Sequence, residues 1–188
     1  MTSAGYVANF FIDLANNDEY GDGMTNMRLN KLLFFAQGHY FARIGQPLFN
    51  DDFEAWTYGP VVADIYRRYN KYGRSPIEEV AAGYNYESFS SDELDVLLDV
   101  AREYGRYSTS ELVKITHTDD SPWASSYQSS TSQAITKNQI KEYFMSFKKL
   151  ESFDDLLLRS NIPVYDKRSD DNYLLLSRDD SGEYEDAV

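Results

Sequence analysis

Cations and aromatic rings alternate in one short stretch of the chain, residues 53–74. If a helix continues through its second half, Arg67, Lys71 and Arg74 share one face, with tyrosines interleaved. Cations among rings suit a nucleic-acid backbone or an acidic protein partner, whereas the structural alternative is a solvated helix face. Because the net charge is −13, we expect an acidic protein segment rather than DNA.

The start of this stretch has the residues of an anchored turn. We expect Trp56 and Tyr58 to fix the turn and Gly59 to adopt an unusual backbone dihedral. Pro60 is expected to open a helix at its first position, where the missing N–H costs nothing.

A second tryptophan stands beside a proline in a Ser/Thr-rich segment, residues 118–134, which is predicted to be a loop. Pro122 and Trp123 are expected to pin this loop. Because Trp is enriched at interface hot spots, the two Trp-Pro turns are also candidates for one rigid recognition surface.

The chain has two histidines and no cysteine. Metal sites commonly need two or three ligands at short spacing, but His39 and His117 lie far apart in the sequence. We expect His39 to pack within an aromatic helix, and His117 to close a helix or order the loop after it. An enzyme of unrecognised type that uses either histidine is the catalytic alternative.

Known catalytic and cofactor motifs are absent from the sequence. It contains neither the phosphate-binding G-x-x-x-x-G-K-[ST] pattern nor a G-x-S-x-G elbow. The five Asp-Asp pairs fall in expected loops or helix starts, where solvated surface is the default interpretation. We therefore expect no cofactor, no metal and no enzymatic activity.

Length and composition indicate one domain with an acidic extension. The chain has 188 residues, of which 42% are hydrophobic and 15% aromatic. Residues 151–188 hold 11 of the 31 acidic residues and 4 of the 18 basic ones. We see no signal peptide and no 18-residue apolar run, and the lack of cysteine fits a reducing cytoplasm.

Hydrophobic periodicity predicts a mainly α fold: a compact single domain of about five or six helices in residues 1–150. The strongest helix runs from an N-cap at Thr25 to a stop at Gly45, and its broad apolar surface predicts a central, buried position. Capping-box patterns start two further helices at Ser90 and Ser108. A short β element is expected near 53–57. In residues 151–188 we expect a short hairpin and then a mobile tail, which could also cover the basic face.

Several blocks, in the right order, resemble the Panacea domain family, the SocA-like antitoxin group also labelled phage-associated GepA-like proteins. The match covers about residues 3–147 and leaves the tail outside. Its blocks are Leu29–Gln37, Pro47–Phe49, Glu54–Val61, Tyr66 with Tyr72–Gly73, Ser108–Trp123 and Ile135–Phe144.

The resemblance implies an antitoxin of a toxin-antitoxin system rather than an enzyme. Such proteins neutralise a cognate toxin by direct binding or, in the SocA-like case, by delivering it to a protease; family partners include alarmone-synthetase-like and membrane-active toxins. The expected contact residues are Trp56, Tyr58, Arg67, Lys71, Arg74 and Trp123. The alternative is a DNA-binding autoregulator of its own operon, or a phage-related regulatory protein, that uses the basic residues at 66–74.

Overall fold

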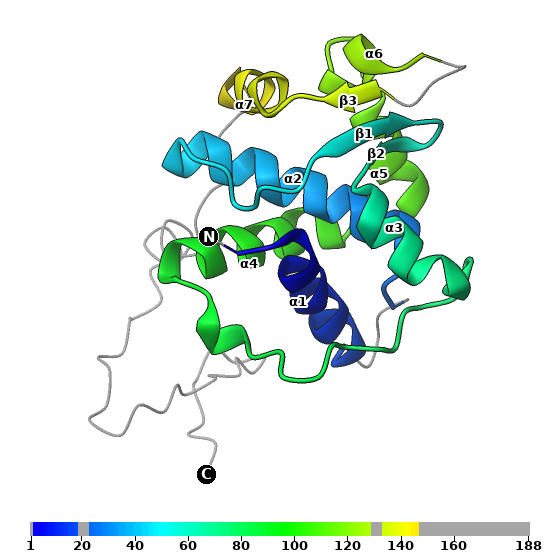
Figure 1. The fold of residues 1–188 in the computed structure, drawn as a ribbon, viewed down its shortest axis with the longest axis vertical. Coiled ribbons are helices and arrows are strands. Elements are labelled where there is room, and N and C mark those ends of the chain that lie inside the picture. The colour runs from blue at the N-terminus through cyan, green and yellow to red at the C-terminus, as the bar shows by residue number, and fades with distance from the viewer. Residues whose placement is uncertain (1, 19–22, 129–132, 147–188) are drawn as a thin grey trace, which may run out of the picture. The chain divides into compact units, whose positions relative to one another are not determined.

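The fold is mainly α, as the sequence predicts. The computed structural model describes residues 2–18, 23–128 and 133–146, which contain seven α-helices and a three-stranded antiparallel sheet (Figure 1). The expected boundary at residue 150, the C-terminal hairpin and the acidic extension 151–188 lie outside the described residues. No helix in the described ranges is long and apolar enough to cross a membrane.

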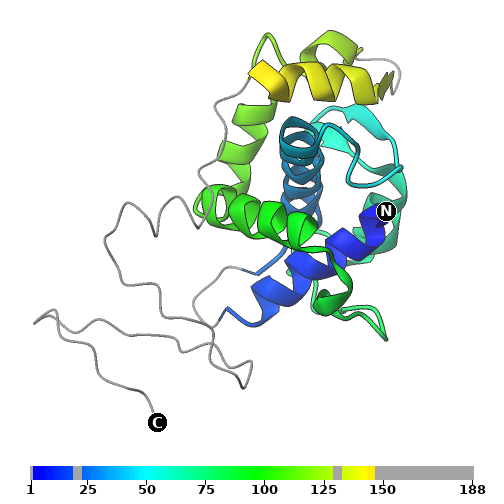
Figure 2. The same cartoon turned by 90° about the vertical axis from the view of Figure 1, so that its left-hand side faces the viewer.

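Helix α2 (Asn26–Ile44) is the central element, and its predicted buried position is confirmed. The Thr25 side chain accepts a hydrogen bond from the backbone of Arg28, and Gly45 ends the helix with a φ of 82°. All residues from Leu29 to His39 are buried. Figure 2 shows α2 enclosed by α1 (Ala4–Asn16), α4 (Ser91–Gly105), α5 (Thr109–Thr116) and α7 (Lys137–Ser146), which all contact it.

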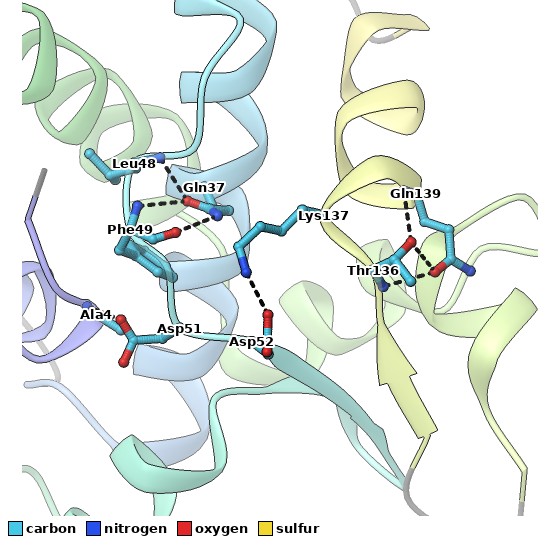
Figure 3. A network of polar contacts seen from close by, with 9 residues as sticks. All are labelled: Ala4, Gln37, Leu48, Phe49, Asp51, Asp52, Thr136, Lys137 and Gln139. Atoms are coloured by element: carbon cyan, nitrogen blue, oxygen red, sulfur yellow. Dashed lines mark hydrogen bonds and ion pairs between the residues drawn. The ribbon is translucent and has the colours of Figure 1, made fainter.

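The predicted caps are also confirmed. Helices α4 and α5 each begin with a capping box, in which Ser90 pairs with Glu93 and Ser108 with Glu111. The side-chain oxygen of Gln139 accepts hydrogen bonds from the backbone and the hydroxyl of Thr136 at the start of α7 (Figure 3). These signals are local, so the sequence alone is enough to find them.

The sheet has the strand order β2-β1-β3, with β1 at Phe53–Trp56, β2 at Gly59–Val61 and β3 at Gln133–Ile135. Strand β1 confirms the predicted β element near 53–57. The expected loop at 118–134 instead contains a short helix, α6 (Pro122–Ser126), and most of β3. Ser121 caps α6 and Pro122 stands at its first position, which is a local sequence signal of a helix start.

The prediction that Pro60 opens a helix is wrong. Pro60 lies in β2, opposite Ala55, and helix α3 (Ala63–Tyr69) begins three residues later. Strand β2 is an edge strand, where a residue without an N–H is tolerated. The helix also ends early: a 3₁₀ turn follows at Asn70–Tyr72, and Gly73 has a φ of 58°.

A buried glutamine fixes the loop that leads into β1. The Gln37 side chain accepts hydrogen bonds from the backbone N–H groups of Leu48 and Phe49 at 3.0 and 3.2 Å, and donates one to the Phe49 carbonyl at 3.0 Å. Asp51 accepts from the backbone of Ala4 on α1, and Asp52 pairs with Lys137 on α7 (Figure 3). The loop is thereby tied to three helices.

Replacement of Gln37 by Leu should lower the free energy of unfolding by about 3 kcal/mol, because three buried backbone groups lose their partner. Gln46→Leu, at an exposed position of the same loop, should change it by less than about 0.5 kcal/mol. Urea unfolding followed by circular dichroism measures both. Equal stabilities of the two variants would show that Gln37 does not hold the loop.

Candidate partner-binding site

Two buried asparagines on α2 hold the chain that follows the β1–β2 hairpin. The Asn30 side chain accepts from the backbone N–H of Val62 at 2.9 Å and donates to the Asn26 carbonyl. Asn26 in turn donates to the Tyr66 carbonyl at 2.9 Å. Buried backbone N–H and C=O groups outside regular secondary structure need hydrogen-bond partners of this kind. The two side chains therefore place β2 and α3 against the first half of α2.

Lys31 is the third buried polar group on this part of α2. Its side chain is 1% exposed, and its Nζ donates to the Pro60 carbonyl at 3.0 Å. Burial lowers its pKa from 10.5 to about 7, because the charged form loses its hydration. Neutral and charged forms of Lys31 thus coexist near pH 7.

Gly59 makes room for this lysine. It has a φ of 103°, and a Cβ at this position would lie 2.9 Å from both Lys31 Cε and Thr116 Oγ1. Both the backbone conformation and the close approach require glycine. The unusual dihedral expected at Gly59 is therefore linked to the burial of Lys31.

The hairpin turn is anchored by the second stretch that the sequence singles out. Trp123 donates its indole N–H to the Trp56 carbonyl at 2.7 Å. One ring nitrogen of His117 lies 2.6 Å from the Val113 carbonyl and the other 3.3 Å from the Thr57 carbonyl. Figure 1 shows α5 and α6 beside the hairpin, which they contact. The two Trp-Pro stretches thus meet in the fold.

Three rings pack together in this anchor. The rings of His117 and Trp123 are tilted by 50° with centroids 3.7 Å apart, and Tyr127 stacks on Trp123 with centroids 4.7 Å apart. His117 also follows directly after α5 as its C-cap residue. This position fits the expectation that His117 closes a helix.

A pocket of about 690 Å³ opens between the hairpin, the start of α2 and the end of α3. Tyr58, at the tip of the hairpin turn, is 62% exposed. The Trp56 ring lies edge-on to Tyr66, with centroids 4.9 Å apart. The lining of the pocket includes two cations, Lys31 and Arg74, two amides, Asn26 and Asn30, and four rings, Trp56, Tyr58, Tyr66 and Tyr127.

The expected basic face of 67–74 is not formed as one helix face. Because α3 ends at Tyr69, Arg74 lies beyond the turn and lines the pocket. Arg67 pairs with Asp64 and Lys71 with Glu79, in ion pairs whose side chains are all more than half exposed. Exposed ion pairs of this kind contribute little to stability. Arg67 and Lys71 are not among the residues that line the pocket. The DNA-binding alternative assumed one continuous basic helix face, and this face is not formed.

The other histidine belongs to the core. His39 is 5% exposed, and its Nε2 lies 2.8 Å from the Tyr104 hydroxyl. Burial, and secondarily the charge of Arg43, lowers its pKa to about 4. In the described ranges no group of three or more His, Asp or Glu side chains could hold a metal ion.

A second hollow, of about 900 Å³, lies beside α1 and α4. Its lining mixes Arg28, Arg102 and Arg106 with Asp18 and Glu111, so its charges do not select a partner of one sign. Arg28 already donates to the carbonyls of Tyr107 and Gly105. We therefore take the ring-lined pocket as the candidate site.

Sequence reasoning missed Lys31, Asn26 and Asn30. The signal was present: two asparagines four residues apart, followed by a lysine, stand in a helix that is otherwise apolar over most of its surface. Polar residues on a helix predicted to be fully buried need partners, and these partners are distant backbone groups that no local pattern reveals.

Lys31→Met tests the buried cation through the pH dependence of stability. The unfolded chain keeps its lysine protonated up to about pH 10.5, while the folded protein releases this proton above about pH 7. The free energy of unfolding of the wild type minus that of Lys31→Met should therefore be lowest below pH 7. This difference should rise by on the order of 3 kcal/mol by pH 10. Urea unfolding along a pH series measures this difference, and other titrating groups cancel between the two proteins. A difference that stays constant from pH 6 to pH 10 would contradict it.

Comparison with known proteins places the chain within a family. The model of the family described as antitoxin SocA-like, Panacea domain, matches residues 29–124, which is more than half of the 188 residues. Antitoxin SocA of Caulobacter vibrioides (strain NA1000 / CB15N) is 32% identical over 126 residues, which cover 62% of this chain and 66% of that protein. The chain thus spans just under two thirds of this relative's length. No solved structure matches the chain.

The matched range contains most of α2, the β1–β2 hairpin, α3 and Trp123. Most of the pocket lining lies in this range, whereas Asn26, Met27, Tyr127 and Gln128 lie outside it. The resemblance seen in the sequence blocks is confirmed: the chain belongs to the SocA-like antitoxin family with a Panacea domain.

Proposed function

We propose that this protein is an antitoxin that neutralises a cognate protein toxin by direct binding, and that the ring-lined pocket is its binding surface. It acts as a binding protein rather than as an enzyme. The observation that carries the proposal is the pair of distant sequence stretches, 56–58 and 117–127, that join to present rings around a pocket.

The physical features of this surface suit protein recognition. Tyr58 is exposed on a turn whose backbone is held by Trp123 and His117, so little conformational entropy is lost when a partner contacts it. Aromatic residues and Arg are enriched at interface hot spots, and Trp56, Tyr66 and Arg74 lie around the same pocket. The similarity to Antitoxin SocA supports a toxin as the partner.

Two routes of neutralisation are consistent with binding. In the first, the antitoxin covers the active surface of the toxin. In the second, it brings the toxin to a protease, and the toxin then disappears. We propose the first route as the primary one, because a preformed, rigid surface is enough for it.

Expression of the neighbouring reading frame tests the function. Alone, this partner should arrest growth, and co-expression with the present chain should restore growth and allow the two proteins to co-purify. Immunoblotting then separates the routes, since toxin levels stay unchanged under steric inhibition and fall under proteolysis. A harmless neighbour, or toxicity that the chain cannot relieve, would contradict the antitoxin function.

Tyr58→Ala should weaken binding of the co-purified toxin at least about tenfold, because it removes an exposed ring at the pocket without touching the core. Tyr86→Ala is the matched control: Tyr86 is 53% exposed and Tyr58 62%, but Tyr86 lies on the 3₁₀ turn Tyr86–Ser88. Isothermal titration calorimetry measures both. If the two variants bind equally well, the pocket is not the surface.

An Arg67→Glu/Lys71→Glu double variant tests how far the surface extends along α3. Neither side chain lines the pocket, and each already has an acidic partner, so affinity should change less than about threefold. A loss as large as that of Tyr58→Ala would extend the toxin contact to the outer face of α3. The same calorimetric titration provides the comparison.

A further inference from the structure

Lys31 is a buried cation for which the described part of the chain supplies no carboxylate. The ion pairs there join other residues, and the one acceptor found for Lys31 Nζ is the Pro60 carbonyl at 3.0 Å. An ammonium group has three N–H donors. A buried charge in this situation is costly unless an anion or further acceptors complete its surroundings.

The pocket that Lys31 lines carries positive charge only. Its described lining contains Lys31 and Arg74 and neither Asp nor Glu, although acidic residues outnumber basic ones 31 to 18 in the chain. The acidic group that touches a lining residue is Glu54, which accepts the indole N–H of Trp56 at 2.8 Å. Low-dielectric walls strengthen the attraction between such cations and an incoming anion.

The dimensions of the pocket favour a ligand larger than a small inorganic anion. A volume of about 690 Å³ lies in the range of sites for drug-sized ligands. The rings of Trp56, Tyr58 and Tyr66 provide apolar and edge contacts beside the cations. A carboxylate attached to a larger, partly apolar group fits these walls better than a free inorganic ion does.

We propose that the pocket binds an acidic side chain, Asp or Glu next to an apolar residue, from an exposed segment of a protein partner. The carboxylate pairs with Lys31 Nζ, Arg74 adds a second cation at the exposed rim, and the apolar neighbour packs on the rings. This inference names the chemistry recognised by the surface proposed above, and it rests on that proposal for the partner being a protein.

Binding of a carboxylate should be coupled to proton uptake. Burial holds the pKa of Lys31 at about 7, and a carboxylate beside it stabilises the charged form and raises that pKa. The acid-bearing ligand therefore binds more tightly at pH 6 than at pH 9, by about tenfold if the pKa rises to about 8 or above. The other charged or titratable groups around this wall are Glu54, Tyr58, Tyr66, Arg74, Tyr127 and, behind Thr116, His117.

Nuclear magnetic resonance on the full chain tests the inference without the toxin. The probes are blocked dipeptides, acetyl-Leu-Glu-amide and its uncharged counterpart acetyl-Leu-Gln-amide, together with inorganic phosphate. The resonance of the Lys31 side chain is assigned by its absence from the spectrum of Lys31→Met, and its chemical shift is followed along a pH series. Lys114→Met, which removes an exposed cation of α5 that does not line the pocket, serves as the control.

The glutamate dipeptide should shift the Lys31 signal, raise the pKa of Lys31 to about 8 or above, and bind about tenfold more weakly at pH 9 than at pH 6. Lys31→Met should abolish the preference over the glutamine dipeptide, and Lys114→Met should leave it in place. Equal binding of the two dipeptides, no response of Lys31, or tighter binding of phosphate than of the glutamate dipeptide would each overturn the inference.

The co-purified toxin gives a second, separate readout. Lys31→Met should weaken its binding at least about tenfold and remove the pH dependence. If the chain neutralises no toxin but its pocket still selects the glutamate dipeptide, the proposed function fails while the carboxylate site stands. If neutralisation is intact in Lys31→Met and the dipeptides bind equally, the carboxylate inference fails while the antitoxin function stands.

Discussion

The structure depends on the hydrogen bonds that α2 gives to irregular backbone packed against it. A helix buried on nearly all sides would leave the neighbouring turns and edges with unpaired polar groups. Gln37 pairs with the loop before β1, while Asn30 and Lys31 pair with the segment after the hairpin turn. The apolar residues of α2 form the core, and its few polar ones decide where the hairpin lies. The position of Trp56 and Tyr58 is a consequence of those bonds.

The same arrangement explains why the candidate site is rigid on one side and exposed on the other. Backbone groups of the hairpin are held by α2 beneath it and by His117 and Trp123 beside it. The Tyr58 side chain at the turn remains exposed. A fixed backbone with exposed rings is the arrangement in which contacts with a partner cost least conformational entropy.

The sequence predicts best where the signal and the structure it causes are close together. The capping boxes at Ser90 and Ser108, the stop at Gly45 and the broad apolar surface of α2 are all local, and all are confirmed. Pro60 shows the limit, because its place after Gly59 fits a helix start as well as an edge strand. The pairing of Ala55 with Pro60 and the contact with Lys31 decide the outcome, and both depend on the tertiary fold.

The candidate site was predicted in part, for the same reason. Residue type alone indicates Trp56, Tyr58 and Trp123, and the structure brings them to one region. The prediction of Arg67, Lys71 and Arg74 as one face assumes that a helix continues to residue 74, whereas α3 ends at Tyr69 and, of the three, Arg74 lines the pocket. Lys31 was overlooked because its partner is the Pro60 carbonyl, and no spacing rule connects a lysine with a backbone group so far along the chain.

Amide hydrogen exchange with and without the co-purified toxin would show whether the partner contacts the ring-lined pocket. We expect protection on binding to be concentrated in the hairpin turn at Thr57 and Tyr58 and in the segment around Gly73 and Arg74. Protection confined to the face of α1 and α4 around Leu14 and Leu98, with the hairpin turn unchanged, would contradict it.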